Sequence, residues 1–195
     1  VKYRHGHKYQ LGYIGVMGIQ DGVDLLLEAL KILVSEYKVD AFLTLAGGGT
    51  ELDSLRIRCS ELGLDDNVKF YGKISDDLLL KNLIVSSDVC LGPDRSSELN
   101  NLSTMNKIIE YMALAKPMVI FESKESRFSA KDAAIYVTPD DVRQFAKEIK
   151  DLLEKPQLMA DLGARGRKRF IEELCWENQI QNLEKAYWLR GNENS

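Results

Sequence analysis

Short apolar runs alternate along the chain with longer segments whose apolar residues recur every three or four positions. Apolar runs of this length are typical of buried strands, and the longer periodic segments are typical of amphipathic helices. The predicted strands are 11–17, 41–46, 68–71, 88–91, 117–121 and 134–137. The predicted helices are 21–37, 50–62, 76–86, 103–115, 141–154, 156–171 and 176–189, with Thr50 and Ser103 as N-caps and one helical turn in the loop 121–131.

Strands that alternate with helices indicate a parallel sheet, because each helix carries the chain back across the sheet before the next strand. We therefore expect an α/β fold: a Rossmann-like doubly wound parallel sheet of about six strands, with helices on both faces and a helical carboxyl-terminal tail. Ligands of such sheets bind beyond the carboxyl ends of the strands. The loops expected to form the site are 15–22, 47–51, 72–76, 92–106 and 121–131.

The length of 195 residues fits one domain. We expect a linker at 1–10, the folded domain at 11–190 and a tail at 191–195. Because the chain opens with Val1 followed directly by a polar stretch, we interpret it as a piece of a longer protein that begins in a linker.

Composition excludes several classes of protein. Hydrophobic residues make up 45% and charged residues 29%, which excludes intrinsic disorder, and the net charge of −4 argues against nucleic-acid binding. No apolar run approaches the roughly 18 residues of a membrane span. The three cysteines are widely spaced without a CxxC pair, so neither a disulfide framework nor a zinc site is predicted, and a reducing cytoplasm fits best.

Glycines gather at two of the expected strand ends. The loop from Gly15 to Gly22 joins the first strand to its helix, as a phosphate-cradling turn does. It has neither the GxGxxG spacing nor a Lys or Arg, so a plain tight turn stays open as the alternative. The run 47–49 likewise allows either a close approach of ligand or a simple turn.

The segment 100–117 carries more chemistry. With Ser103 as its N-cap, the helix start leaves unpaired backbone amides that suit a diphosphate. Lys107 in the first turn suits an anionic ligand, and Glu110 lies on the same helix face, where its carboxylate can accept hydrogen bonds from two ribose hydroxyls. A plain surface ion pair between Lys107 and Glu110 is the alternative. The amides in question are those of Thr104, Met105 and Asn106.

These segments occur in an order that resembles the carboxyl-terminal, nucleotide-sugar-binding domain of GT-B glycosyltransferases, in particular family 4, the glycosyl transferases group 1. The resemblance covers nearly the whole chain. The matching stretches are YIGVMGIQDGVDLLLEAL at 13–30, LAGGGTELDSL at 45–55, LGLDDNVKFYGKI at 62–74, SDVCLGPD at 87–94, KIIEYMALAKPMV at 107–119 and KAYW at 185–188.

The resemblance implies roles for individual residues. Glu110 matches the second glutamate of the family's E-x7-E motif, which binds the ribose of the donor. Lys73 and Ile74 lie in the turn whose main chain reads the nucleotide base. Gly15 and Gly18 match the glycine-rich turn near the diphosphate and the acceptor cleft.

Three positions depart from the family pattern. Leu102 stands where the first glutamate of E-x7-E belongs, and Val16 and Asp21 replace the arginine and lysine that stabilise the departing diphosphate. The replacements we consider are Lys107 with the amides of 103–106, and then Arg95.

The function implied by the resemblance is the donor-binding half of a retaining glycosyltransferase. Such an enzyme transfers a hexosyl group from a nucleotide-diphospho-sugar to a saccharide or polyprenol-linked acceptor. The alternative is a nucleotide-binding or structural module without transferase activity. In that case the missing Arg/Lys pair reflects the loss of transfer. A nicotinamide-dependent dehydrogenase is disfavoured by the absence of GxGxxG. No catalytic residue is assigned, and no metal or other cofactor is expected.

The implied partners are the nucleotide sugar and an amino-terminal acceptor-binding domain of the same chain, without which the isolated domain is expected to be inactive. The basic run at 163–169 is either a solvated helix face or a contact with anionic lipid. The expected location is the cytoplasm, with the inner face of the cell membrane as an option for the full protein.

Overall fold

The computed structural model of the chain describes residues 3–191. Six strands form one sheet in the order β3-β2-β1-β4-β5-β6, and every neighbouring pair is parallel. The predicted fold class is confirmed. The strands are β1 (Tyr9–Ile14), β2 (Ala41–Ala46), β3 (Val68–Gly72), β4 (Val89–Gly92), β5 (Met118–Phe121) and β6 (Ala134–Val137).

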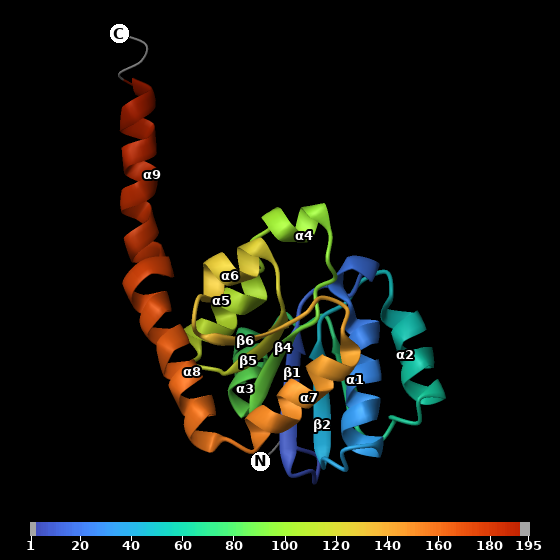
Figure 1. Cartoon of the computed structure of the whole chain (residues 1–195). Helices are drawn as coiled ribbons and strands as arrows, with labels where there is room; N and C mark the ends of the chain where they lie inside the picture. Colours follow the sequence, from blue (N-terminus) through green and yellow to red (C-terminus); the bar gives the residue numbers. More distant parts are fainter. Residues whose placement is uncertain (1–2, 192–195) are drawn as a thin grey trace.

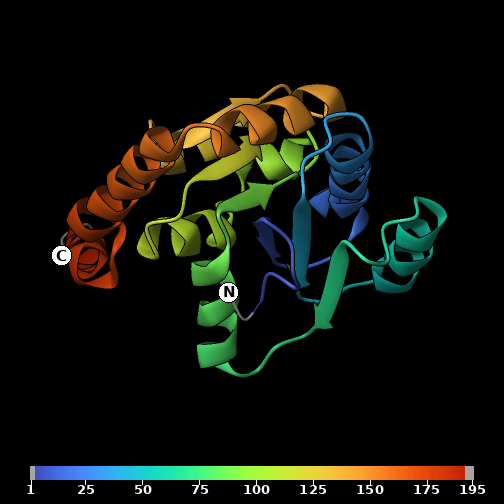
Figure 2. The same ribbon diagram turned by 90° about the horizontal axis from the view of Figure 1, so that it is seen from below.

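Helices cover both faces of this sheet (Figures 1 and 2). Side chains of β1 alternate between the two layers: Leu11 and Tyr13 join the core under α1 and α7, whereas Ile14 joins the core under α3 and α5. The helices are η1 (Ile19–Asp21), α1 (Val23–Ser35), α2 (Leu52–Glu61), α3 (Asp77–Ser86), α4 (Glu98–Leu102), α5 (Asn106–Ala113), α6 (Lys124–Ala130), α7 (Val142–Leu153), α8 (Pro156–Arg169), η2 (Phe170–Leu174) and α9 (Trp176–Gly191).

The predicted domain ends need correction. β1 begins at Tyr9, inside the predicted linker 1–10, because Tyr9 pairs in register with Ala41 of β2. The strand ends at Ile14 and not at residue 17, since Gly15 turns the chain with a φ of 147°. At the other end α9 includes Gly191, and the rest of the predicted tail 191–195 lies outside the described residues.

Two predicted helix starts are also wrong. Ser103 does not cap a helix over 103–115; it ends the short helix α4, and its hydroxyl donates to the carbonyl of Leu99 at 2.8 Å. The N-cap of α5 is Met105, which has no capping side chain. Thr50 does not cap α2 either, because that helix begins at Leu52 after the N-cap Glu51.

The strand order reverses between β1 and β4, and α5 is fastened at this point. The buried hydroxyl of Tyr111 accepts a hydrogen bond from the amide of Ile14 at 3.1 Å and donates one to the carbonyl of Leu91 at 3.2 Å. Tyr111 therefore joins α5 to the carboxyl ends of both central strands. A crevice outside this reversal is where doubly wound sheets bind ligands.

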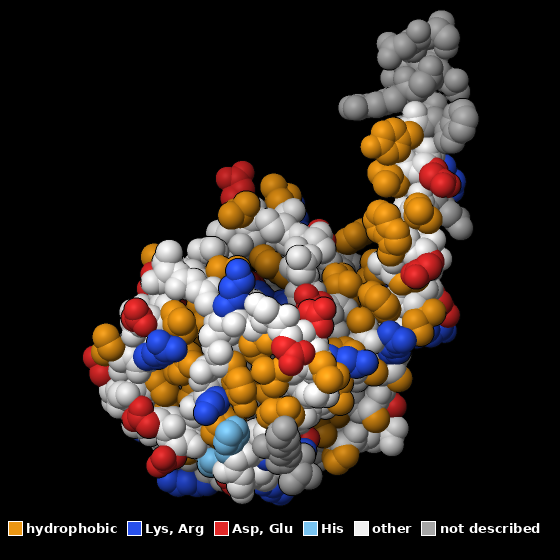
Figure 3. Space-filling view, turned by 180° about the vertical axis from the view of Figure 1, so that it is seen from behind, with side chains coloured by type: hydrophobic (Ala, Val, Ile, Leu, Met, Phe, Trp, Pro, Cys, Tyr) orange, Lys and Arg blue, Asp and Glu red, His pale blue; other side chains and the backbone are white. Residues whose placement is uncertain are grey.

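The carboxyl-terminal helix α9 projects away from the sheet (Figure 1), and apolar side chains lie along it (Figure 3). The basic run on α8 is partly internal: Arg169 is buried and donates to the carbonyls of Phe128 and Ser129. Arg169 therefore stabilises the packing of α8 on α6 instead of forming part of a solvated face. Within the described range 3–191, no helix is both long and apolar enough to cross a membrane.

Candidate functional site

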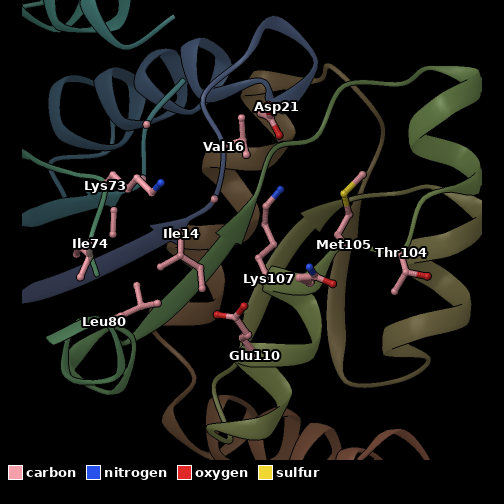
Figure 4. A pocket seen from close by; sticks show the side chains of 15 residues that line it. Ile14, Val16, Asp21, Lys73, Ile74, Leu80, Thr104, Met105, Lys107 and Glu110 are labelled. Carbon is pink, nitrogen blue, oxygen red and sulfur yellow. The ribbon is translucent and has the colours of Figure 1, made fainter. Parts of the chain in front are cut away.

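A cavity of about 660 Å³ lies outside the carboxyl ends of the central strands, beside α5 (Figure 4). Four of the five loops expected at the site contribute to its wall. A volume of this size is typical of pockets for small-molecule ligands. The lining residues are Ile14, Gly15, Val16, Asp21, Ala46, Gly47, Gly48, Lys73, Ile74, Leu80, Thr104, Met105, Asn106, Lys107 and Glu110.

The loops after β1 and β2 close one side of the cavity by direct backbone contact. Gly47 has a φ of 142°, and a Cβ atom there would clash with the carbonyl oxygen of Gly15. The amide of Gly47 donates to the carbonyl of Gly72, which ties the same loop to the end of β3. The glycines at 47–49 therefore allow loops to pack closely, whether or not a ligand also approaches them.

The amino end of α5 forms the opposite side. Thr104, Met105, Asn106 and Lys107 all line the cavity. Because Met105 offers no side-chain acceptor to the first amides of the helix, this end keeps the partial positive charge of a helix N-terminus. The arrangement is suited to an anion.

Lys107 is buried, with 7% of its side chain exposed, although it lines the cavity. Its ammonium forms an ion pair with Asp94, whose side chain is 12% exposed. The ammonium also lies 5.3 Å from the centre of the Tyr13 ring, a cation–π contact. Gly15 leaves the space for this side chain, since a Cβ there would lie 3.2 Å from Lys107 Cε.

Asp21 is held by the turn that contains it. Its carboxylate accepts a hydrogen bond from the amide of Gly18 at 2.9 Å. Burial raises the pKa of the Asp21 carboxyl, and Asp94 raises it further, whereas the Gly18 amide and Lys107 lower it. The position that carries a lysine in the family pattern thus holds a partly desolvated carboxyl group, next to the cavity and close to Lys107.

Glu110 projects into the cavity from the same helix as Lys107 (Figure 4). Desolvation in this wall raises the pKa of its carboxyl. The surface ion pair with Lys107, considered as the alternative from the sequence, is not among the ion pairs of residues 3–191, because the Lys107 ammonium pairs with Asp94. Glu110 is therefore available to accept hydrogen bonds from a ligand.

Lys73 and Ile74 form the far end of the cavity, next to Leu80. They follow β3 directly after Gly72, whose φ of 68° turns the chain into the cavity wall. Main-chain groups and apolar side chains meet here, a combination that suits a flat heterocyclic ring.

Eight of the ten predicted binding residues line the cavity, and Gly18 and Ser103 do not. The amide of Gly18 donates to the carboxylate of Asp21, and the hydroxyl of Ser103 donates back to α4. Arg95, the second candidate for the phosphate cation, pairs with Asp24 and donates to the carbonyl of Ile19. It is absent from the residues that line this cavity.

Asp94 was missed by the sequence analysis as a separate site residue. It follows β4 at the reversal of strand order and contacts a lysine thirteen positions further along the chain. The available signal was its place: an acidic residue two positions after a strand that ends at the predicted site. Among residues 3–191, no group of three or more His, Cys, Asp or Glu side chains is arranged to hold a metal ion.

Comparison with known proteins agrees with this geometry. The family described as "Glycosyl transferases group 1" matches residues 8–155, well over half of the chain. A relative from Bacillus subtilis (strain 168), named "Putative glycosyltransferase EpsD", is 28% identical over 94% of this chain. The match covers 48% of that relative, so the chain spans about half the length of the curated protein it resembles.

Solved structures show the same fold. HepE of Anabaena, in a crystal structure with UDP, matches 94% of this chain and 50% of its own with a TM-score of 0.78 at 19% identity. The C-terminal domain of LpcC, a glycosyl transferase group 1 family protein of Francisella tularensis, matches with a TM-score of 0.69 at 20% identity, over 83% of this chain and 84% of its own. The chain therefore belongs to the glycosyl transferases group 1 family, and its fold is that of the carboxyl-terminal, Rossmann-like domain of GT-B glycosyltransferases.

Proposed function

We propose that this chain is the donor-binding half of a retaining glycosyltransferase, which transfers a hexosyl group from a nucleotide-diphospho-sugar to a saccharide or polyprenol-linked acceptor. The observation that carries the proposal is the placement of Lys107 and Glu110. One helix presents both side chains to a cavity at the reversal of strand order. A cation and a carboxylate so arranged match the diphosphate and the ribose of one ligand.

The diphosphate is assigned to Lys107 and the amino end of α5. Backbone amides and a buried ammonium are strong partners for phosphate oxygens because they are fixed before the ligand arrives. Lys107 replaces the cations missing at Val16 and Asp21, since it is the lining residue that brings positive charge to this end of the cavity. Val16 then forms an apolar wall beside the phosphates.

The nucleoside is assigned to the other end. Glu110 accepts hydrogen bonds from the two ribose hydroxyls, and the main chain of Lys73 and Ile74 reads the base. UDP in the related HepE structure supports uridine as the first nucleoside to test. A second HepE structure, with UDP-glucose, supports a hexosyl donor.

The chemistry follows from this placement. The bond between the anomeric carbon and the diphosphate oxygen breaks, and its electron pair stays on the diphosphate. The acceptor hydroxyl oxygen bonds to the anomeric carbon, and the hydroxyl proton passes to the departing diphosphate. Lys107 and the α5 amides stabilise the charge that develops on the leaving diphosphate. Because the chain spans about half of its curated relative, we assign the acceptor site to the remainder of the full-length protein.

Calorimetric titration of the 195-residue chain tests the proposal. We expect UDP or GDP to bind with a Kd of about 10 to 1,000 µM, equivalent to roughly −7 to −4 kcal/mol, while transfer to any acceptor stays undetectable. Failure of all nucleotides and nucleotide sugars to bind at 1 mM would contradict the donor-site assignment. Nucleotide binding by a full-length enzyme that transfers no sugar would favour the alternative, a binding module without transferase activity.

A further inference from the structure

We propose that Asp94 is a specificity-determining residue of this site, which makes the cavity favour the nucleotide sugar over the free nucleoside diphosphate. The proposal rests on the proposed function above. It starts from the ion pair between Asp94 and Lys107 at the phosphate end of the cavity.

The ion pair between Asp94 and Lys107 stays intact when a ligand binds. Both side chains are almost fully buried, with 7% of Lys107 and 12% of Asp94 exposed. Separating them would leave a desolvated charge without its partner, which is strongly unfavourable. A diphosphate therefore joins Asp94 at the Lys107 ammonium and does not displace it.

The phosphate end is consequently poor in positive charge. Asp94 pairs with the ammonium of Lys107, and Asp21 lies close enough to both for their charges to act on the pKa of its carboxyl. Lys73, the second lysine of the wall, lies on the opposite side of the cavity (Figure 4). Each additional negative charge on a ligand at this end is thus repelled by two carboxyl groups and attracted by one ammonium and the helix dipole.

Substrate and product differ by one such charge. The diphosphate of a nucleotide sugar is a diester with two negative charges at neutral pH. A free nucleoside diphosphate ends in an unesterified phosphate group, whose second ionisation occurs near pH 6 and adds a third charge. The resident carboxylate of Asp94 therefore weakens binding of the product more than binding of the substrate, and it speeds departure of the diphosphate after transfer.

The test compares two ligands that differ only in this charge: UDP and its β-methyl ester, titrated into the 195-residue chain at pH 8. If the first titrations select guanosine, GDP and its β-methyl ester are used instead. In the wild-type protein we expect the ester to bind at least as tightly as UDP. In Asp94→Asn, UDP should gain about tenfold in affinity and overtake the ester, because one repelling charge is removed.

Two further variants separate charge from structure. Asp94→Glu keeps the carboxylate and should keep the wild-type ratio of the two affinities. Asp88→Asn breaks a different ion pair, the one between Asp88 and Arg4 just before β4 begins, and should leave the ratio unchanged. If Asp94→Asn does not fold, the Asp94→Glu ratio and the wild-type ratio still test the proposal.

Other outcomes overturn the inference in recognisable ways. Wild-type protein that binds UDP more than threefold tighter than the ester shows that Asp94 does not discriminate. Equal weakening of both ligands by Asp94→Asn shows that the residue only holds Lys107 in place. If neither ligand binds the wild-type chain, the donor-site assignment itself fails, and this proposal fails with it.

Discussion

Lys107 and Glu110 lie one helical turn apart on α5, yet the ammonium of Lys107 pairs with Asp94 and the carboxylate of Glu110 faces the cavity. A helix normally brings residues three apart close enough to interact. Here the buried carboxylate of Asp94 takes the lysine, because an ammonium with little exposure gains more from a desolvated partner than from one at the cavity wall. Because Lys107 and Glu110 do not pair with each other, an ammonium and a carboxylate can both contact one ligand.

Glu110→Gln should weaken nucleotide binding by roughly 10- to 150-fold, because a charge-assisted hydrogen bond to the ribose is worth about 1.5–3 kcal/mol. Calorimetry with UDP measures this loss. Glu148→Gln on α7, a carboxylate outside the residues that line the cavity, is the matched control and should bind as the wild type does. Unchanged affinity in Glu110→Gln would remove Glu110 from the ribose site.

The affinity for the uncharged nucleoside should rise with pH through the raised pKa of Glu110. Desolvation raises this pKa, so the carboxyl stays protonated to higher pH than usual, whereas ribose hydroxyls bind best to the ionised form. Binding therefore favours loss of the proton and strengthens as pH increases above about 4.3, the ordinary value of a glutamate. Titration of uridine across this range measures the effect, and Glu110→Gln should flatten the profile.

Lys107→Met should weaken UDP binding far more than uridine binding and should reduce the dependence of UDP affinity on salt. It also leaves Asp94 buried without its partner, which destabilises the fold by roughly 3–5 kcal/mol. The double variant Lys107→Met/Asp94→Asn should recover stability but not UDP affinity.

The control for Lys107→Met is Lys116→Met, a change of the same charge just beyond the other end of α5. It should leave both affinities unaltered. Equal losses of uridine and UDP in Lys107→Met would contradict a phosphate role for the lysine and leave the α5 amides as the phosphate site.

Tyr111→Phe should lower the free energy of unfolding by about 1–3 kcal/mol, because the buried amide of Ile14 and carbonyl of Leu91 lose their shared partner. Urea denaturation measures the change. Tyr37→Phe, a partly exposed tyrosine beside α1, should change stability by less than about 0.5 kcal/mol. A loss in Tyr111→Phe no larger than that would show that the β1–β4 connection does not depend on the hydroxyl.

Most of the fold could be predicted because its signals are local. β2 and β6 have the predicted bounds, since an apolar run between breakers defines a buried strand. The start of α5 could not be predicted, because Ser103 serves equally well at the end of one helix and the beginning of the next. The five-residue helix α4 is too short to show periodicity, so 98–102 looked like a polar loop.

The site could be predicted where the charge of a side chain and its place on one helix were enough. Lys107 in the first helical turn suits an anion, and Glu110 lies on the same helix face. The role of Asp94 could not be predicted from the sequence. It depends on β4 lying beside β1, and the order of all the strands in the sheet determines that neighbour. The sequence shows Asp21 only as the residue that replaces the family's lysine. The structure adds that its carboxylate holds the Gly18 amide and that burial raises its pKa.

Tyr111 also fixes the position of α5, and with it the spacing of the two ligand contacts that the helix carries. Its hydroxyl fixes the helix to the ends of β1 and β4, and on the same rigid rod Lys107 and Glu110 are separated by about 4.5 Å along the axis. Any sliding of α5 would move Lys107 and Glu110 together. The distance between the phosphate contact and the ribose contact therefore cannot be adjusted by movement of the helix. A ligand with a longer or shorter bridge can then be accommodated only by exchanging one of the two side chains.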